Sequence, residues 1–221
     1  MKIITDSKEN ITKLAADKIR ELVAEKPNAA IAFAAGNSFR ELFSELEGAD
    51  FKDVEAFSVC EYIGSDKISH ELEAELYSKT GITKIHKPCE EEPEKYDEEI
   101  AACGGLDLVV LGIGLNGHIG FNEPATPYDT KTHVQQLTDS TKRMKAELFD
   151  GEMNVPNRAV TMGLKTICSA KNVILVAFGE EKAEIVHKLV YGRTETYIPA
   201  AMLQLHMNML LYLDGEAAAK L

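Results

Sequence analysis

Apolar residues along the chain recur in two spacings, one typical of helices and the other typical of buried strands. The segment 7–27, SKENITKLAADKIRELVAEKP, has apolar residues every three or four positions and stops at a proline, which predicts an amphipathic helix. Short unbroken apolar runs, separated by such helical segments, predict buried strands. We expect strands at 29–35, 54–59, 106–113, 158–163, 172–179 and 209–214, and further helices at 39–46, 71–81, 140–149 and 180–192.

The alternation of strands and helices predicts an α/β fold with a largely parallel sheet. A length of 221 residues suits one domain, so we expect residues 1–221 to form a single α/β domain. In open sheets of this kind, ligands bind beyond the carboxyl ends of the strands, where the connecting loops collect. The glycine-rich loops of this chain follow strands, which predicts one pocket built from several loops.

Charge and targeting signals narrow the classes of function. The formal net charge of −12 argues against a nucleic-acid-binding protein, which normally presents a basic face. A phosphorylated substrate remains compatible with this charge, because a pocket can be locally positive. The N-terminal residues MKIITDSKEN lack the apolar core of a signal peptide, and no later apolar run is long enough to cross a bilayer.

The cysteines are scattered along the chain without a CxxC pair. This pattern is typical of reduced thiols rather than of a disulfide framework or a zinc site, and it favours a cytoplasmic protein. The four cysteines are Cys60, Cys89, Cys103 and Cys168.

The most specific pattern is the loop GIGLNGHIGFNEP at residues 112–124, directly after a predicted strand. Its glycines indicate unusual dihedral angles or close backbone contact with a ligand. His118 stands between glycines, and Glu123 follows five residues later. A carboxylate that accepts a hydrogen bond from one ring nitrogen raises the basicity of the other, so we interpret the two residues as an acid–base pair. The alternative is that Glu123 caps a helix or pairs with a lysine.

Two further segments are candidates for binding a phosphate. In AAGNS, residues 34–38, a glycine follows a strand, and the next helix offers free N–H groups to an anion held by Gly36, Asn37 and Ser38. The alternative is a tight turn with Ser38 as the helix cap. Lys182 follows the strand at 172–179, where it either reaches a phosphate in the same pocket or lies in solvent on a charged helix.

Together these segments resemble one family. Five segments are similar, in their order along the chain, to segments of the glucosamine-6-phosphate deaminases, and the similarity covers nearly the whole chain. They are AAGNS, CEYIG, LGIGLNGHIGFNEP, FGEEKA and LQLH. Members of that family are aldose–ketose isomerases of amino sugar catabolism, which convert glucosamine 6-phosphate to fructose 6-phosphate and ammonia. The related 6-phosphogluconolactonases share the fold and a GxGxxGH loop, but they usually continue without FNEP.

The resemblance implies a Rossmann-like domain with a mixed, largely parallel sheet and helices on both faces. It also implies that His118 assists opening of the sugar ring, with Glu123 as its carboxylate partner and Asn116 beside it. It implies no metal or organic cofactor, and it suggests a homo-oligomer. The substrate-binding positions, which include the phosphate ligands, are then Gly36, Asn37, Ser38, Gly114, Gly117 and Lys182.

One departure from the family's pattern concerns the reacting carbons. The family's aspartate that moves a proton between C2 and C1 is matched here by Cys60 in CEYIG. A thiol with an ordinary pKa of about 8.5 is mostly protonated at pH 7. Either a Cys60 thiolate, if the pocket lowers its pKa, or the neighbouring Glu61 would then move this proton.

Other departures concern the phosphate. The family's phosphate-binding arginine is matched by Glu147, for which Lys142 or Arg143 would substitute, and its usual threonine is matched by Ala35. Three functions therefore stay open. They are a hexosamine 6-phosphate deaminase, an isomerase or lactonase for another sugar phosphate such as galactosamine 6-phosphate, and a catalytically impaired sugar-phosphate-binding protein.

Overall fold

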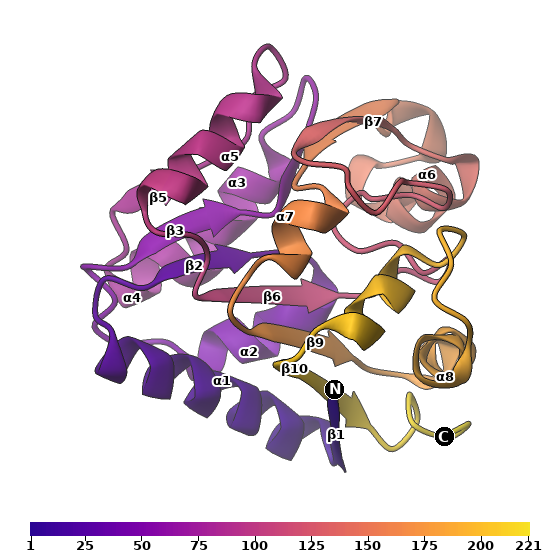
Figure 1. Ribbon diagram of the computed structural model, residues 1–221, viewed down its shortest axis with the longest axis horizontal. Coiled ribbons are helices and arrows are strands. Elements are labelled where there is room, and N and C mark those ends of the chain that lie inside the picture. Colours follow the sequence, from indigo (N-terminus) through magenta and orange to yellow (C-terminus); the bar gives the residue numbers. More distant parts are fainter.

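The computed structural model describes residues 1–221 and shows an α/β architecture around a central sheet of seven strands (Figure 1). The strand order is β1-β10-β9-β6-β2-β3-β5, and each neighbouring pair is parallel. The predicted fold class is therefore confirmed. The strands of this sheet are β1 (Lys2–Asp6), β2 (Ala30–Phe33), β3 (Glu55–Ser58), β5 (Lys84–His86), β6 (Leu108–Gly112), β9 (Val173–Ala177) and β10 (Met209–Asp214).

A second sheet of three strands holds the antiparallel pairings, in the order β4-β8-β7. Its strands are β4 (Cys60–Tyr62), β7 (His133–Gln136) and β8 (Arg158–Thr161). The strand predicted at 158–163 exists, but it lies in this sheet and not among the parallel strands. The antiparallel strands thus form a small sheet of their own beside the parallel one. Since β4 starts directly after the carboxyl end of β3, the small sheet adjoins the edge where ligands are expected.

Helices cover both faces of the central sheet, as predicted. In Figure 1, α1 and α2 lie on one face, and α5 and α7 lie on the other. Ser7 caps the first helix by accepting a hydrogen bond from the Asn10 amide at 3.3 Å. The helices are α1 (Lys8–Glu25), α2 (Arg40–Glu45), α3 (Lys67–Leu72), α4 (Ser78–Thr80), α5 (Pro93–Ala102), α6 (Asp139–Lys145), α7 (Leu164–Cys168) and α8 (Ala183–Tyr191).

The core lies along both faces of the central strands. Strands β2 and β9 are buried at every position and β6 at all but its last, as expected for unbroken apolar runs in a parallel sheet. Asp107, just before β6, is a buried charged residue that accepts hydrogen bonds at 2.7 Å from both Lys26 and Lys171. Its carboxylate also accepts from the Ala30 amide at 2.9 Å, so it fixes the amino ends of neighbouring strands.

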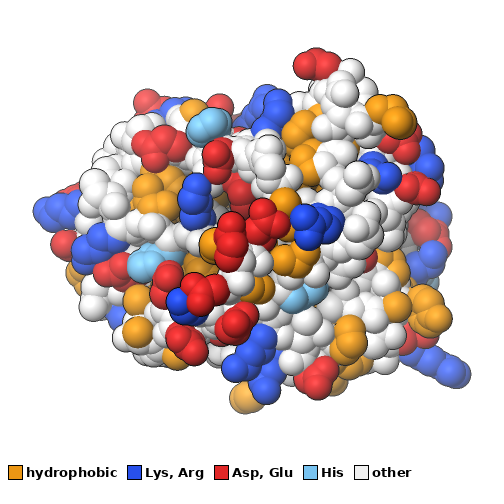
Figure 2. All heavy atoms as spheres, turned by 90° about the horizontal axis from the view of Figure 1, so that it is seen from above, with side chains coloured by type: hydrophobic (Ala, Val, Ile, Leu, Met, Phe, Trp, Pro, Cys, Tyr) orange, Lys and Arg blue, Asp and Glu red, His pale blue; other side chains and the backbone are white.

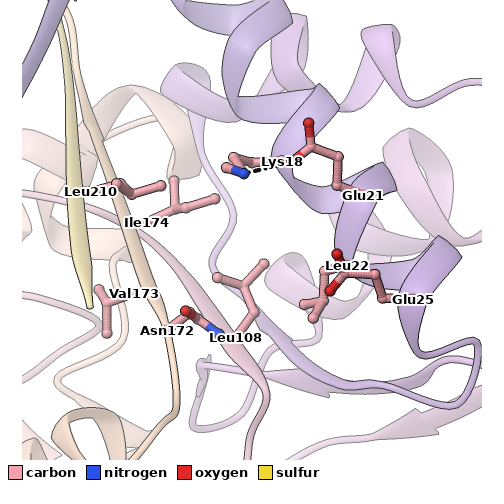
Figure 3. Close-up of a pocket in the computed structure, with 9 residues that line it drawn as sticks. All are labelled: Lys18, Glu21, Leu22, Glu25, Leu108, Asn172, Val173, Ile174 and Leu210. Atoms are coloured by element: carbon pink, nitrogen blue, oxygen red, sulfur yellow. Dashed lines mark hydrogen bonds and ion pairs between the residues drawn. The ribbon is translucent and has the colours of Figure 1, made fainter. Parts of the chain in front are cut away.

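An opening of about 160 Å³ lies between α1 and the amino ends of β6, β9 and β10 (Figure 3). Leu108, Ile174 and Leu210 line it on the sheet side, and an ion pair between Lys18 and Glu21 lies on the helix side. The loops with candidate chemistry gather at the opposite, carboxyl edge of the sheet. We therefore regard this opening as a packing gap between a helix and the sheet.

The surface mixes charges of both signs. On the face shown in Figure 2, acidic and basic side chains are interspersed, which is not the pattern of a basic nucleic-acid-binding face. None of the helices combines the length and the apolar character needed to span a membrane.

Candidate active site

The loops at the carboxyl edge of the sheet surround one cavity of about 350 Å³, within the size range of small-molecule sites. It is lined from several loops, as the sequence predicted. The predicted site residues that line it are Gly36, Asn37, Ser38, Cys60, Gly114, His118 and Lys182. The predicted site residues that do not line it are Glu61, Asn116, Gly117 and Glu123.

The loop after β2 presents backbone to the cavity. Gly36 has a φ of 134°, a conformation that L-residues rarely adopt, and it begins a single 3₁₀ turn over Asn37–Phe39 that leads into α2. The first amides of such a turn have no partner within it, so they are available to an anion. Ser38 does not act as a helix cap, because neither the turn nor α2 has a side-chain cap hydrogen bond.

His118 lies buried at the base of the cavity, with its ring against the backbone of Gly114. A Cβ at position 114 would lie 2.3 Å from the His118 Cε1 atom, so only glycine leaves room for the imidazole. The ring Nδ1 lies 3.4 Å from the Thr141 hydroxyl, and Nε2 has no protein partner. Burial, followed by the nearby charges of Lys145 and Lys182, lowers the pKa of His118 to about 3. The imidazole is therefore neutral at physiological pH and has one nitrogen free for a substrate.

Glu123 and His118 are connected indirectly. Glu123 Oε2 accepts a hydrogen bond at 3.0 Å from the Asn116 amide, and Asn116 Oδ1 accepts one at 3.2 Å from the His118 backbone N–H. Glu123 Oε1 accepts from the backbone amide of Thr138, the N-cap of α6, at 3.1 Å. The expected carboxylate–imidazole contact is therefore absent, because Asn116 and the start of α6 hold the carboxylate. The alternative that Glu123 supports a helix start agrees with these contacts.

Glu61 is an anchor for α3 and not a free base. Its buried carboxylate accepts hydrogen bonds from the backbone amides of Tyr62, Ile68 and Ser69 and from the Ser69 hydroxyl, at distances of 2.7 to 3.1 Å. These four donors hold both carboxylate oxygens at the start of α3, and Glu61 does not line the cavity. The structure therefore places Glu61 where it supports α3, while the prediction that it moves the substrate proton finds no support in its position.

Cys60, at the start of β4, does line the cavity. Only 5% of the residue is exposed, and burial, followed by the charge of Glu61, raises its pKa well above the ordinary range. The nearby Lys145 acts in the opposite direction without reversing the shift. The side chain at the place of the family's aspartate is therefore a neutral thiol, and the alternative of a Cys60 thiolate is not supported.

Two lysines face the cavity without a carboxylate in an ion pair with either. Lys182 donates to the Ile113 carbonyl at 2.9 Å, and Lys145, the last residue of α6, makes no hydrogen bond or ion pair with another side chain. Burial, opposed by Glu181 and reinforced by Lys145, lowers the pKa of Lys182. The acidic residues on the lining are Glu71, which lies 3.9 Å from Arg40, and Glu181, which is exposed. Two cations in one buried cavity, next to free amides, suit a phosphate.

Lys145 is the functional residue that the sequence reasoning missed. Lys142, one of the two proposed substitutes for the family's arginine, pairs instead with Asp139 at 3.2 Å. The other, Arg143, is exposed and does not line the cavity, and the same holds for Glu147. Lys145 lies four residues after Thr141, on the same side of α6 as the hydroxyl that meets His118, and the sequence alone does not reveal that this side faces the cavity.

Gly117 has a structural role. Its φ is 84°, and a Cβ there would lie 2.8 Å from Cγ2 of Ile198, outside the cavity. The expected substrate contact at Gly117 is thus replaced by close packing that lets the loop turn towards His118.

Comparison with known proteins gives one consistent result. The sequence profile of the glucosamine-6-phosphate isomerases/6-phosphogluconolactonase family matches residues 5–212. The glucosamine-6-phosphate deaminase of Thermoanaerobacter sp. (strain X514) is 37% identical over 236 aligned positions, covering 98% of this chain and 93% of that protein.

Solved structures agree with this relationship. A monomeric glucosamine-6-phosphate deaminase superposes with a TM-score of 0.95 at 30% identity, with all of both chains covered. The 6-phosphogluconolactonase of Trypanosoma cruzi shares the fold at a TM-score of 0.80 and 18% identity, covering 100% of this chain and 96% of that one. With its glycine loop, neutral histidine and cationic cavity, the chain belongs to the family of glucosamine-6-phosphate isomerases and 6-phosphogluconolactonases.

Proposed function

We propose that the chain is a glucosamine-6-phosphate deaminase-like aldose–ketose isomerase. It would convert a hexosamine 6-phosphate and water to the ketose 6-phosphate and ammonia. One observation carries this proposal: a neutral histidine and two lysines without carboxylate partners line the same cavity. The deaminase relatives at 34–37% identity support the choice of reaction.

The phosphate of the substrate would bind between Lys145, Lys182 and the turn that begins at Gly36. Lysine ammonium groups and free backbone amides give charge-assisted hydrogen bonds to phosphate oxygens. A bound dianion would also neutralise two like charges that now repel each other. The sugar would then extend from this end of the cavity towards His118 and Cys60.

Ring opening needs a group that takes a proton from the O1 hydroxyl and returns one to the ring oxygen. A neutral imidazole with a free Nε2 can do both in turn. The bonds of Asn116 and Thr138 to Glu123 hold the loop around His118, so that the ring stays directed into the cavity. We assign ring opening to His118 and loop positioning to Glu123 and Asn116.

The transfer of the proton from C2 to C1 is the step that Cys60 makes difficult. A neutral buried thiol is a weak base, and the structure places no free carboxylate at that position. This observation favours a second candidate function, in which the chain binds and opens the sugar phosphate but turns it over slowly or acts as a sugar-phosphate-binding homologue.

Incubation with glucosamine 6-phosphate is expected to release ammonia and fructose 6-phosphate in equal amounts. Galactosamine 6-phosphate and 6-phosphogluconolactone serve as the competing substrates. Ketose or acid formed without ammonia would reassign the chain to another sugar phosphate. Binding without any product would leave the second candidate, and the absence of both binding and product would overturn the proposal.

Replacing Lys145 by alanine is expected to weaken the apparent affinity for glucosamine 6-phosphate by about 10- to 100-fold. This is the loss of one charge-assisted hydrogen bond to phosphate, about 1.5–3 kcal/mol. The measurement is KM in turnover or Kd in direct binding. Lys142→Ala is the matched control, because Lys142 lies on the same helix but pairs with Asp139. Equal affinity of the two variants would show that Lys145 is not a phosphate ligand.

We propose that residues 1–221 act as a single deaminase-like α/β domain. The four cysteines are free thiols, which supports a reducing compartment, and we propose the cytoplasm.

A further inference from the structure

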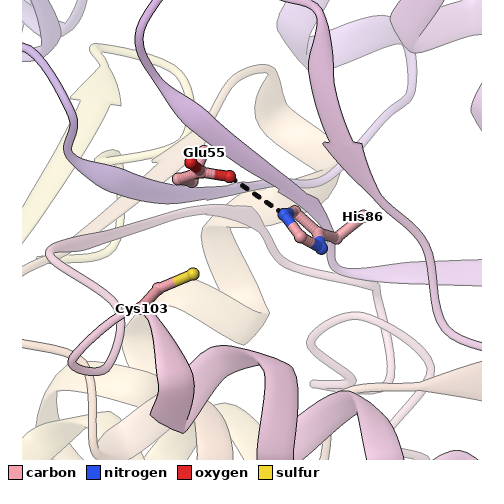
Figure 4. Close-up of side chains that lie close together, drawn as sticks. All are labelled: Glu55, His86 and Cys103. Atoms are coloured by element: carbon pink, nitrogen blue, oxygen red, sulfur yellow. Dashed lines mark hydrogen bonds and ion pairs between the residues drawn. The ribbon is translucent and has the colours of Figure 1, made fainter.

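Three side chains that bind transition metals lie together at an edge of the central sheet, away from the sugar-phosphate cavity. They are Glu55, His86 and Cys103, and their ligating atoms all lie within 4.8 Å of one another (Figure 4). We propose that this cluster is a zinc-binding site of the chain. This site would be independent of the sugar-phosphate reaction, and it could not be recognised from the sequence because its three ligands are far apart along the chain.

Two of the ligands come from paired strands on one face of the sheet. Glu55 begins β3 and His86 ends β5, where His86 lies directly opposite Phe57 in the register. The imidazole stacks on the Phe57 ring, with centroids 4.3 Å apart and planes inclined by 9°. Glu55 and Phe57 are two residues apart on a strand, so their side chains share a face. The imidazole edge is therefore held beside the Glu55 carboxylate.

The end of α5 supplies the third ligand. Tyr96 of this helix donates to the backbone carbonyls of Ser58 at 2.8 Å and His86 at 3.0 Å, which fixes the helix to both strands. Cys103 follows the last residue of α5, and its thiol is directed towards the space beside Glu55 and His86 (Figure 4). Three separate elements thus bring sulfur, nitrogen and oxygen ligands to one point.

The ligand chemistry favours zinc. Thiolate, imidazole and carboxylate are its usual protein ligands, and three of them leave a fourth tetrahedral position for water. A Zn²⁺ ion with one thiolate and one carboxylate gives a neutral centre. Bond lengths of about 2.0–2.3 Å place the ligands about 3.5 Å apart. The ligating atoms of these half-buried side chains must therefore approach one another by about 1.3 Å at most.

Glu99 of α5 orients the imidazole. Its Oε2 atom lies 3.1 Å from His86 Nδ1, while Nε2 lies 3.1 Å from Glu55 Oε2. A carboxylate on one ring nitrogen leaves the other nitrogen as the metal ligand, an arrangement typical of zinc sites. On binding, zinc would lie between Nε2 and the Glu55 carboxylate.

Zinc binding also accounts for the proton of the thiol. When the metal–sulfur bond forms, Cys103 loses its proton to solvent. Lys84 pairs with Glu55 Oε1 at 3.2 Å and leaves the other carboxylate oxygen for the metal.

The test is titration of the chelator-treated protein with zinc against a chromophoric chelator, and with Co²⁺ as a spectroscopic probe. One Zn²⁺ per chain is expected, with a thiolate-to-cobalt charge-transfer absorption. Cys103→Ser should remove that absorption and weaken zinc binding by at least about 100-fold. Cys89→Ser is the matched control, because Cys89 is an exposed cysteine outside the cluster, and it should change neither.

Glu99→Gln separates positioning from ligation. It should weaken zinc binding by about 10- to 100-fold while the thiolate–cobalt absorption remains. The absence of this absorption in the wild type would overturn the proposal even if a variant failed to fold. Undiminished zinc affinity in folded Cys103→Ser, or an equal loss in Cys89→Ser, would overturn it as well.

Discussion

Cys60→Asp is expected to raise the rate of ammonia release from glucosamine 6-phosphate by about 10²- to 10⁴-fold, the usual contribution of a positioned general base. The thiol of the wild type is buried and protonated, so it is a poor acceptor for the C2 proton at neutral pH. An aspartate has an ordinary pKa of about 3.9, several units below that of a thiol, so it is a far better candidate for an ionised base at the same place. The substitution therefore adds a base to a cavity that already holds the other groups.

The control for this prediction is Cys60→Asn, which has nearly the shape of aspartate but cannot act as a base. Its rate of ammonia release should stay at or below that of the wild type. The binding of glucosamine 6-phosphate should be similar in all three proteins, because the proposed phosphate ligands are unchanged. If Cys60→Asp is no faster than the wild type, the thiol is not what limits turnover.

His118→Ala is expected to lower the rate of sugar-ring opening by about 10²- to 10⁴-fold. Opening can be measured without deamination, as the exchange between the α and β anomers of glucosamine 6-phosphate by NMR. This readout does not require the C2 proton to move, so it is independent of Cys60. The variant should keep its fold, since residues on loops at the sheet edge contribute little to the core.

The same measurement gives a pH dependence with a definite sign. Burial and the nearby lysines hold the pKa of His118 at about 3, below the ordinary value of about 6.5. The imidazole is then neutral at pH 7 and still neutral at pH 5. Wild-type anomer exchange should therefore not fall between these values through protonation of His118. An unchanged rate in His118→Ala, or a loss with a midpoint near pH 6.5, would contradict the assignment.

Long periodic segments were predictable from the sequence, and short ones were not. The helix α1 and the strands β2, β6 and β9 carry enough apolar residues to reveal their type. The three-residue strands β4 and β5 and the five-residue helix α7 are shorter than a pattern needs, and tertiary contacts determine them. β1 was missed because its Lys-Ile-Ile-Thr-Asp sequence is half polar, which suits an edge strand.

The site was predictable where residue type alone reveals a role. Four glycines around a histidine indicated the central loop, and the structure places His118, Cys60 and Lys182 on one cavity. The indirect link from Glu123 to His118 through Asn116 was not predictable, because the position of the Glu123 carboxylate depends on where α6 begins. The choice of Lys145 over Lys142 depends on the rotation of the same helix. The Glu55, His86 and Cys103 cluster depends on which strand lies at the edge of the sheet.

The pairing of β1 with β10 has a consequence for how the protein is made. Lys2–Asp6 pair with Leu210–Asp214, so β1 finds its partner only after about two hundred further residues have been synthesised. Until then β1 is an unpaired strand that must be kept from other chains. Closure of a loop of about two hundred residues also costs entropy before any pairing rewards it. Completion of this edge of the sheet is therefore expected to be a late event in folding, after the β2, β3 and β6 core has formed.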